Sequence, residues 1–216
     1  AMRCIALTIS DQTDDDLPDE MNLLGVIGVV DPVRNEVPEA VKIAHKAGIQ
    51  VIEITGDCTE TAKAVAMEAG IYKPGDLAVT NDEFEAMSDV KVKEIIPQLR
   101  VISRCSPNTK LRLVTLAQEI GMSVAMTGDG VNDAPSLKAA DIGVAMGTGV
   151  DVAKQAADMI LTDDNFATIE KAIEEGRGVY ENIRKSVIFL LSSNLGELMT
   201  MFVAVALGLA SPLKSS

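Results

Sequence analysis

The chain has 216 residues, 47% of them hydrophobic, and a formal net charge of −13. Its length and apolar content suffice for one sizeable domain with a further segment, and they argue against a disordered chain. The charge argues against nucleic acid as a partner, because phosphate binding needs clustered lysine and arginine, whereas acidic residues cluster at 11–20. We interpret that cluster as a solvated loop, with a cation-attracting patch as the alternative.

Short apolar runs alternate with helical segments along most of the chain, a pattern typical of βαβ units. Residues 2–8 are predicted to form a strand that starts abruptly, so we expect the earlier part of its domain to be absent. Further strands are predicted at 24–30, 50–54, 99–102, 123–126, 142–145 and 159–161. Helices are predicted at 36–47, 59–69, 108–119 and 151–157, with broken helical character at 81–96. The fold class is therefore α/β, with a doubly wound, Rossmann-like parallel sheet and functional loops where its strands end.

The last quarter of the chain has a different character. Residues 165–185 combine helical periodicity with mixed charge, and in residues 186–213 the only ionisable side chain is Glu197. That apolar run is long enough to cross a hydrocarbon layer of ~30 Å at ~1.5 Å per residue. No helix breaker separates the two parts, so we predict one long helix that runs from the soluble domain into a membrane. A buried core helix is the alternative.

Three loops that follow predicted strands carry groups suited to phosphate and metal, and the third of them leads to Lys110. In the first, Thr55 offers a hydroxyl and Gly56 an open backbone N–H, and Asp57 completes the turn before a helix. In the second, at 127–133, the carboxylates of Asp129 and Asp133 could hold Mg²⁺. An N-capped turn and a Gly-Asp-rich turn are the respective alternatives.

Four further side chains are candidates for the site or for ion transport. Asn132 could donate to a phosphate, and Lys110, one turn into a helix, supplies the cation that a transferring phosphoryl group needs, although a lone lysine is usually solvated. In the apolar run, Asn194 and Glu197 are three residues apart and share a helix face. Ionisable groups in a membrane span usually line an ion path, and a polar contact between helices is the alternative.

The segment TGDGVNDAPSLKAADIGVAMG at 127–147 resembles the hinge signature of P-type ATPases, which belong to the haloacid dehalogenase superfamily. The segment from Asp31 to Arg34, DPVR, resembles the connection between their nucleotide-binding and phosphorylation domains. ITGD at 54–57 and Lys110 occur in the same order as in that family. The resemblance covers essentially the whole chain and implies a haloacid dehalogenase-like domain followed by a stalk and transmembrane helix.

The resemblance implies roles for individual residues. It places a phosphoryl group against Thr55, Gly56, Lys110 and Asn132, and it makes Asp57 and Asp133 further catalytic residues. It places the nucleotide against Arg104, Asp31 and Arg34. It assigns Mg²⁺ binding to Asp129, with Asp133 supporting that site. It assigns binding of the transported cation to Asn194 and Glu197.

The chain departs from the family in one respect, because the phosphorylated aspartate of P-type ATPases lies in a DKTGT motif that this sequence lacks. We therefore expect this chain alone to be inactive. Ser193-Asn194-Leu195-Gly196-Glu197 is similar to the SNxGE pattern of reticulum-type calcium pumps, which makes Ca²⁺ the expected ion. A sodium/potassium-type pump is the alternative.

The resemblance also implies an organisation and partners. Residues 1–22 would end a nucleotide-binding domain, 23–164 would form most of the phosphorylation domain, and 165–216 the stalk and transmembrane helix. The partners would be ATP, calcium, a lipid membrane and the remaining domains and helices of the pump, with the α/β domain in the cytoplasm. The scattered cysteines, which form no CxxC pair, agree with a reducing compartment. A soluble phosphatase of the same superfamily and a non-catalytic module are the rival interpretations.

Overall fold

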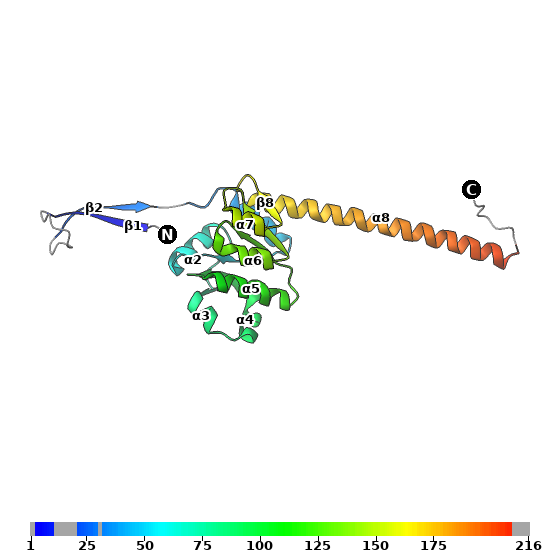
Figure 1. The fold of residues 1–216 in the computed structure, drawn as a ribbon, viewed down its shortest axis with the longest axis horizontal. Helices are drawn as coiled ribbons and strands as arrows, with labels where there is room; N and C mark the ends of the chain where they lie inside the picture. Colours follow the sequence, from blue (N-terminus) through cyan, green and yellow to red (C-terminus); the bar gives the residue numbers. More distant parts are fainter. Residues whose placement is uncertain (1–2, 11–20, 30–31, 209–216) are drawn as a thin grey trace. The chain divides into compact units, whose positions relative to one another are not determined.

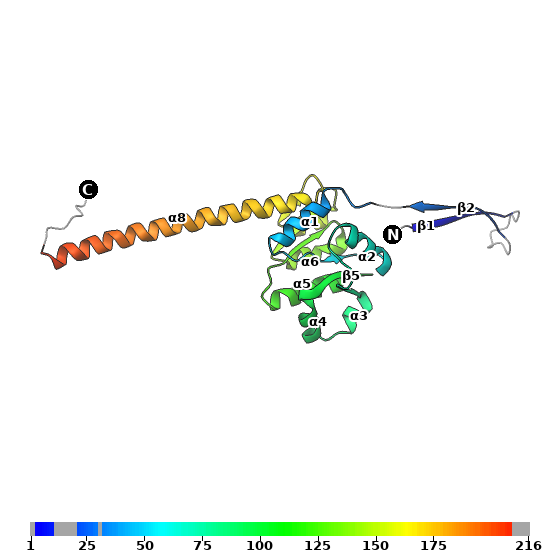
Figure 2. The same ribbon diagram turned by 180° about the vertical axis from the view of Figure 1, so that it is seen from behind.

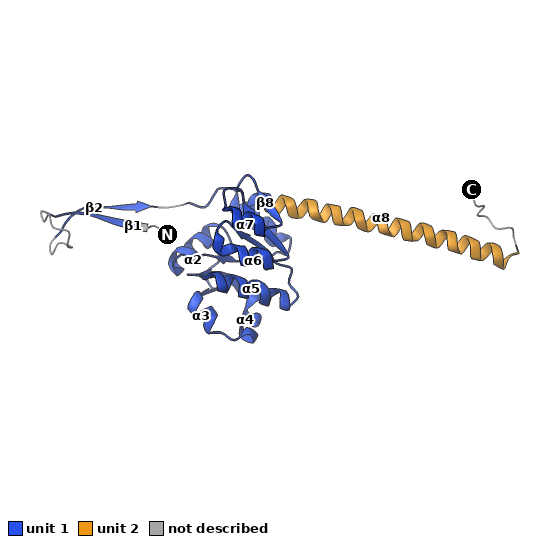
Figure 3. Cartoon of the chain, in the orientation of Figure 1, with its two compact units in different colours: residues 1–168 blue, residues 169–216 orange. Residues whose placement is uncertain are grey.

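The computed structural model describes residues 3–10, 21–29 and 32–208. The chain separates into two compact units, residues 1–168 and residues 169–216 (Figure 3). The predictions for the acidic loop at 11–20, for Asp31 and for residues 209–213 lie outside the described residues.

The first two strands form an antiparallel pair. β1 (Arg3–Ile9) pairs with β2 (Asn22–Val29), with an irregular register between Leu7 and Thr8. The expectation that residues 24–30 join the parallel sheet is therefore wrong. The two strands are close in sequence, and a short connection suffices for antiparallel pairing, whereas parallel pairing needs a long crossover connection. The domain boundary that we predict after residue 22 falls after β1 and within the start of β2, and that boundary stays a prediction.

Six parallel strands form the centre of the first unit. β3 (Glu53–Ile54), β5 (Leu99–Ser103) and β4 (Leu77–Thr80) make one sheet in the order β3-β5-β4. β6 (Ala125–Gly128), β7 (Ile142–Met146) and β8 (Met159–Leu161) make a second sheet in the order β6-β7-β8. The predicted parallel α/β arrangement is confirmed, although the strands fall into two sheets and β4 was not predicted.

Helices cover these sheets on both sides. They are α1 (Val37–Lys46), α2 (Thr59–Glu68), α3 (Asn81–Ala86), α4 (Asp89–Ile95), α5 (Pro107–Glu119), α6 (Ala134–Ala139) and α7 (Asp151–Ala156). α7 is in front in Figure 1 and α1 is in front in the opposite view of Figure 2. The segment predicted as broken helix at 81–96 contains α3 and α4, followed by a 3₁₀ turn at Ile96–Gln98.

Helix α5 joins the two sheets. Its Leu113 packs in a cluster with Phe84, Leu99 and Ile102 of the first sheet's side, while Val114 packs with Met126 of β6. Ile54 of β3 packs against both clusters. The carboxyl ends of strands from both sheets are thereby held around the start of α5, where Lys110 stands.

The second unit is formed by a single helix, α8 (Ala167–Ala206), whose first residues belong to the first unit. The prediction of one continuous helix through the charged and apolar parts is confirmed. Only 6% of its most apolar 18-residue window is buried, which is unlike a core helix. Large apolar side chains such as Phe189 and Leu191 are exposed, so α8 has the length and composition of a membrane span.

Candidate functional site

An ion pair between Lys110 and Asp133 forms the centre of the candidate site. Lys110 Nζ lies 2.6 Å from Asp133 Oδ1, and the two side chains are only 18% and 9% exposed. Asp133 Oδ2 accepts the backbone N–H groups of Asp129 at 3.2 Å and Gly130 at 3.1 Å. Burial alone would raise the pKa of Asp133, but Lys110 and these N–H groups outweigh it and hold that pKa below its usual value. Asp133 is thus a carboxylate in a fixed position that orients the Lys110 side chain and holds the backbone at 129–130.

Local sequence explains how these two residues meet. Ser106 caps α5 by accepting the Thr109 N–H at 3.2 Å, and Pro107 begins the helix, which places Lys110 one turn in. On the other side, a Cβ atom at Gly128 would lie 2.4 Å from Asp133 Cβ. Glycine is therefore required at 128 for the loop to fold back over Asp133.

Asp129 differs from Asp133 because no described residue holds its carboxylate. The residue is exposed, and its carboxylate has no hydrogen bond or ion pair within the described part of the chain. No group of three or more His, Cys, Asp or Glu side chains lies together among the described residues. Mg²⁺ needs only one or two carboxylates because it keeps several waters and binds phosphate oxygens, so a single free carboxylate fits this ion. Asn132, also exposed, lies beside it in the 3₁₀ turn Val131–Asp133.

The Thr55 loop is fastened to the loop that precedes α5. Cys105 N–H donates to the Thr55 carbonyl at 2.9 Å, and Arg104 N–H donates to the Asp57 carbonyl at 2.9 Å. Cys105 directly precedes Ser106, which caps the helix that carries Lys110, so this contact lies at the start of α5. A Cβ atom at Gly56 would meet nothing within 4 Å, so packing does not require glycine there. The structure thus brings together the three loops that the sequence singled out.

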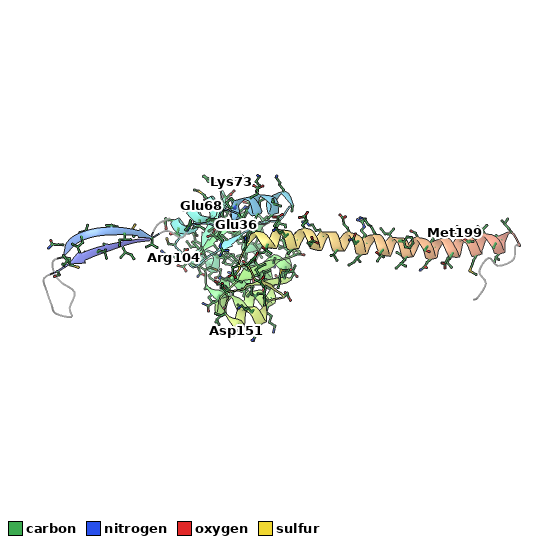
Figure 4. The ribbon with its side chains drawn as sticks, turned by 90° about the horizontal axis from the view of Figure 1, so that it is seen from above. Glu36, Glu68, Lys73, Arg104, Asp151 and Met199 are labelled. Carbon is green, nitrogen blue, oxygen red and sulfur yellow. The ribbon has the colours of Figure 1, made fainter. Side chains whose placement is uncertain are left out.

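Other predicted residues lie elsewhere. Arg104, labelled in Figure 4, is exposed and has a positive φ of 53°. The Arg34 guanidinium donates to the Asp164 carbonyl at 2.9 Å, a contact that the sequence did not suggest. Asn194 and Glu197 belong to α8 and are both exposed, three residues apart as predicted. Asp164 was not predicted as a site residue. Its only sequence signal is the run Asp163-Asp164-Asn165 before a helix.

A partly buried carboxyl group, that of Glu53, stands two residues before Thr55. Burial, together with repulsion from Asp57, raises the pKa of Glu53 to about 7. Because the folded protein holds this proton more tightly than the unfolded chain does, stability falls as pH rises from 4.5 to about 7 and then levels off. Glu53→Gln is expected to stabilise the chain at pH 8 by about 1–2 kcal/mol, allowing for solvent screening. Urea unfolding at pH 4.5 and pH 8 measures this, and a gain of equal size at both pH values would contradict it.

Two cysteines near these loops differ in the acidity of their thiols. Cys58 is exposed, and its hydrogen bond with the Thr61 hydroxyl lowers the pKa of its thiol. Burial raises the pKa of Cys105 to about 11. Because the thiolate is the reactive form, iodoacetamide at pH 8 is expected to alkylate Cys58 well before Cys105, as mass spectrometry of peptides would show. Equal rates for the two thiols would contradict this difference.

Family models and known relatives match this chain over most of its length. A family model described as haloacid dehalogenase-like hydrolase matches residues 5–141, and a second model of the same description matches residues 112–173. The chain is 49% identical over 201 residues to "Calcium-transporting ATPase 1" of Bacillus cereus, covering 93% of this chain and 23% of that protein. It is 50% identical over 197 residues to "Endoplasmic reticulum calcium ATPase srcA" of Aspergillus fumigatus, covering 89% and 20%.

Two further similar proteins are named as transporters of ions other than calcium. The chain is 44% identical over 248 residues to "P-type sodium-transporting ATPase4" of Toxoplasma gondii, covering 100% of this chain and 18% of that protein. A crystal structure of a zinc-transporting PIB-type ATPase matches 89% of this chain and 27% of its own, with a TM-score of 0.65 and 29% identity. The chain therefore spans about a fifth of the length of the curated relatives that it matches.

Proposed function

The chain belongs to the haloacid dehalogenase-like hydrolase family, and on that premise we propose that it is part of a P-type ATPase that pumps calcium across a membrane. The observation that carries the proposal is the pairing of Lys110 with Asp133 beside the free carboxylate of Asp129, in a chain that continues into an exposed apolar helix. The printed names of two relatives, both calcium-transporting ATPases, support calcium. In this proposal, residues 23–164 belong to a cytoplasmic phosphorylation domain and α8 provides the stalk and one membrane span.

The chain's own residues would each perform a part of phosphoryl transfer. Asp129 would hold Mg²⁺, which when bound offsets the negative charge of the phosphates of ATP. The Lys110 ammonium, kept in place by Asp133, would offset charge on the transferring phosphoryl group. Thr55 and Asn132 would donate hydrogen bonds to its oxygens, and the open backbone at Gly56 leaves room for its approach.

The two sheets suggest where the missing nucleophile would stand. β3 and β6 are end strands of their sheets, and Ile54 of β3 packs against the cluster that contains Met126 of β6. We propose that a strand from the rest of the pump, carrying the phosphorylated aspartate, lies between β3 and β6 and joins the two sheets. The chain alone would then lack the acceptor of the phosphoryl group and would be inactive.

Transport would depend on α8. Asn194 and Glu197 supply oxygen ligands on one face of the helix, and a hard cation such as Ca²⁺ prefers oxygen. Since α8 is continuous from the soluble domain through this pair, movement of one end can be transmitted to the other. The remaining helices of the pump would complete the ion site.

The test is phosphoenzyme formation from labelled ATP by the longer protein that contains this chain, with calcium, sodium or a chelator. Labelling is expected to require calcium and to be lost in Glu197→Gln, because the transported ion must bind before phosphorylation. Glu181→Gln, on the same helix but outside the apolar run, is the matched control and should label normally. Labelling that requires sodium instead would overturn calcium but keep the pump.

A soluble phosphatase is the second candidate, favoured by the hydrolase description of the matching family model. It would share the three loops but would have no need of a 40-residue helix whose second half is apolar and exposed. Solubility of the chain without detergent, together with hydrolysis of small phosphate esters, would favour it. Loss of solubility without detergent would favour the pump.

A further inference from the structure

Asp164, which stands three residues before α8, has an unusual backbone. Its φ of 51° lies in the left-handed region, which is unfavourable for residues with a side chain and persists where the surroundings hold it. Asp and Asn tolerate this region better than most residues. The contacts that hold Asp164 therefore indicate what this turn does.

The carboxylate of Asp164 holds the loop after β7. The Thr148 N–H donates to Asp164 Oδ1 at 3.0 Å, and this bond holds the pKa of Asp164 below its usual value. The neighbouring Gly147 N–H donates to the Leu161 carbonyl at 2.8 Å, and the Asp164 N–H donates to the same carbonyl at 3.2 Å. The turn at 161–164 and the loop at 147–148 are thus fixed to each other.

The same loop contacts the backbone of Asp129. The Val150 N–H donates to the Asp129 carbonyl at 2.9 Å. A Cβ atom at Gly149 would lie 3.0 Å from that carbonyl oxygen, so the two segments are in close backbone contact. A displacement of residues 148–150 would therefore move Asp129 or leave its carbonyl without a partner.

The backbone of the Asp164 turn also holds a distant segment. The Asp164 carbonyl accepts the Arg34 guanidinium at 2.9 Å, and Asn165 Nδ2 donates to Glu36 Oε1 at 3.1 Å (Glu36 is labelled in Figure 4). Asn165 Oδ1 accepts the Ala167 N–H at 2.9 Å and so caps α8. One turn therefore joins the Asp129 loop, the segment at 34–36 and the beginning of α8.

We infer that Asp164 is a positioning residue. Its carboxylate holds the loop at 147–150 against Asp129, and its carbonyl fixes the turn at 161–164 to Arg34. The effect of Asp164 on Asp129 passes through the hydrogen bonds of Thr148 and Val150. The inference rests on the proposed function in one respect, because it gives Asp129 the task of holding Mg²⁺.

Two substitutions separate positioning from simple stabilisation. Asp164→Gly removes the acceptor for Thr148 but relieves the left-handed backbone, so its thermal midpoint should not fall. Asp164→Asn keeps an acceptor oxygen and tolerates the same backbone. In Asp164→Gly, hydrogen exchange at the Thr148 and Val150 amides should rise about tenfold, the size expected for one lost hydrogen bond to a charged acceptor. Asp164→Asn should resemble the unchanged protein.

The longer protein provides a second measurement. In Asp164→Gly, the Mg²⁺ concentration for half-maximal phosphorylation should rise several-fold with little change in the maximal rate, and Asp164→Asn should restore it. Wild-type amide exchange and Mg²⁺ dependence in Asp164→Gly, or equal losses in Asp164→Asn, would overturn the inference. Amide exchange in the 216-residue chain needs neither metal nor phosphorylation. An unchanged Mg²⁺ dependence in Asp129→Ala would therefore count against the proposed function and not against the role of Asp164.

Discussion

Replacing Asp133 by alanine is expected to lower the free energy of unfolding of this chain by roughly 3 kcal/mol, as when one partner of a buried ion pair is removed. The change would leave Lys110 with a poorly solvated charge and would free the N–H groups of Asp129 and Gly130. Urea unfolding in detergent, followed by circular dichroism, measures the loss. Asp151→Ala, an exposed carboxylate of α7, is the matched control and should change stability little.

The effect of Asp133 should depend on pH in a defined direction. The folded protein holds the pKa of Asp133 below its unfolded value of about 3.9. The contribution of this carboxylate to the free energy of unfolding is therefore complete above that pH. It is lost as the pH falls through the lower, folded pKa. The difference between the unchanged chain and Asp133→Ala should therefore shrink in strong acid, and a difference that grows there would contradict the ion-pair explanation.

Replacing Asp129 by alanine is expected to affect activity rather than stability. Its carboxylate has no partner in the described part of the chain, so the free energy of unfolding should be nearly unchanged. In the longer protein, loss of a metal ligand should slow phosphorylation by about a hundredfold or more. The measurement is single-turnover labelling from ATP at saturating Mg²⁺. Labelling at the normal rate would show that the metal is held elsewhere, and Asp151→Ala again serves as the control.

The three loops could be predicted because each follows a strand of the parallel fold. Strand ends on one edge of a sheet converge, so Thr55, Lys110 and Asp129 could be assigned to one site from their order along the chain. The ion pair between Lys110 and Asp133 could not, because the sequence offers Asp129 equally as the partner. The difference arises from the 3₁₀ turn at 131–133, which points Asp133 inward.

Contacts distant in sequence were not predictable. Arg34 and Asp164 are 130 residues apart, and neither shows a pattern that would pair them. The pairing of β2 with β1 was missed for a related reason, since a short apolar run suits parallel and antiparallel partners equally. α6 was not predicted either: within the motif at 127–147 we predicted only the loop at 127–133 and the strand at 142–145, and α6 lies between them.

The end position of β3 has a consequence for how the isolated chain behaves in solution. An end strand offers unpaired backbone groups to other molecules, and natural proteins often deter such aggregation with a charged side chain on the strand. Glu53 stands on β3 and gains its charge only near pH 7. The carboxylate that weakens the fold at alkaline pH should therefore keep chains apart, and we expect more aggregation of the isolated chain at pH 6 than at pH 8.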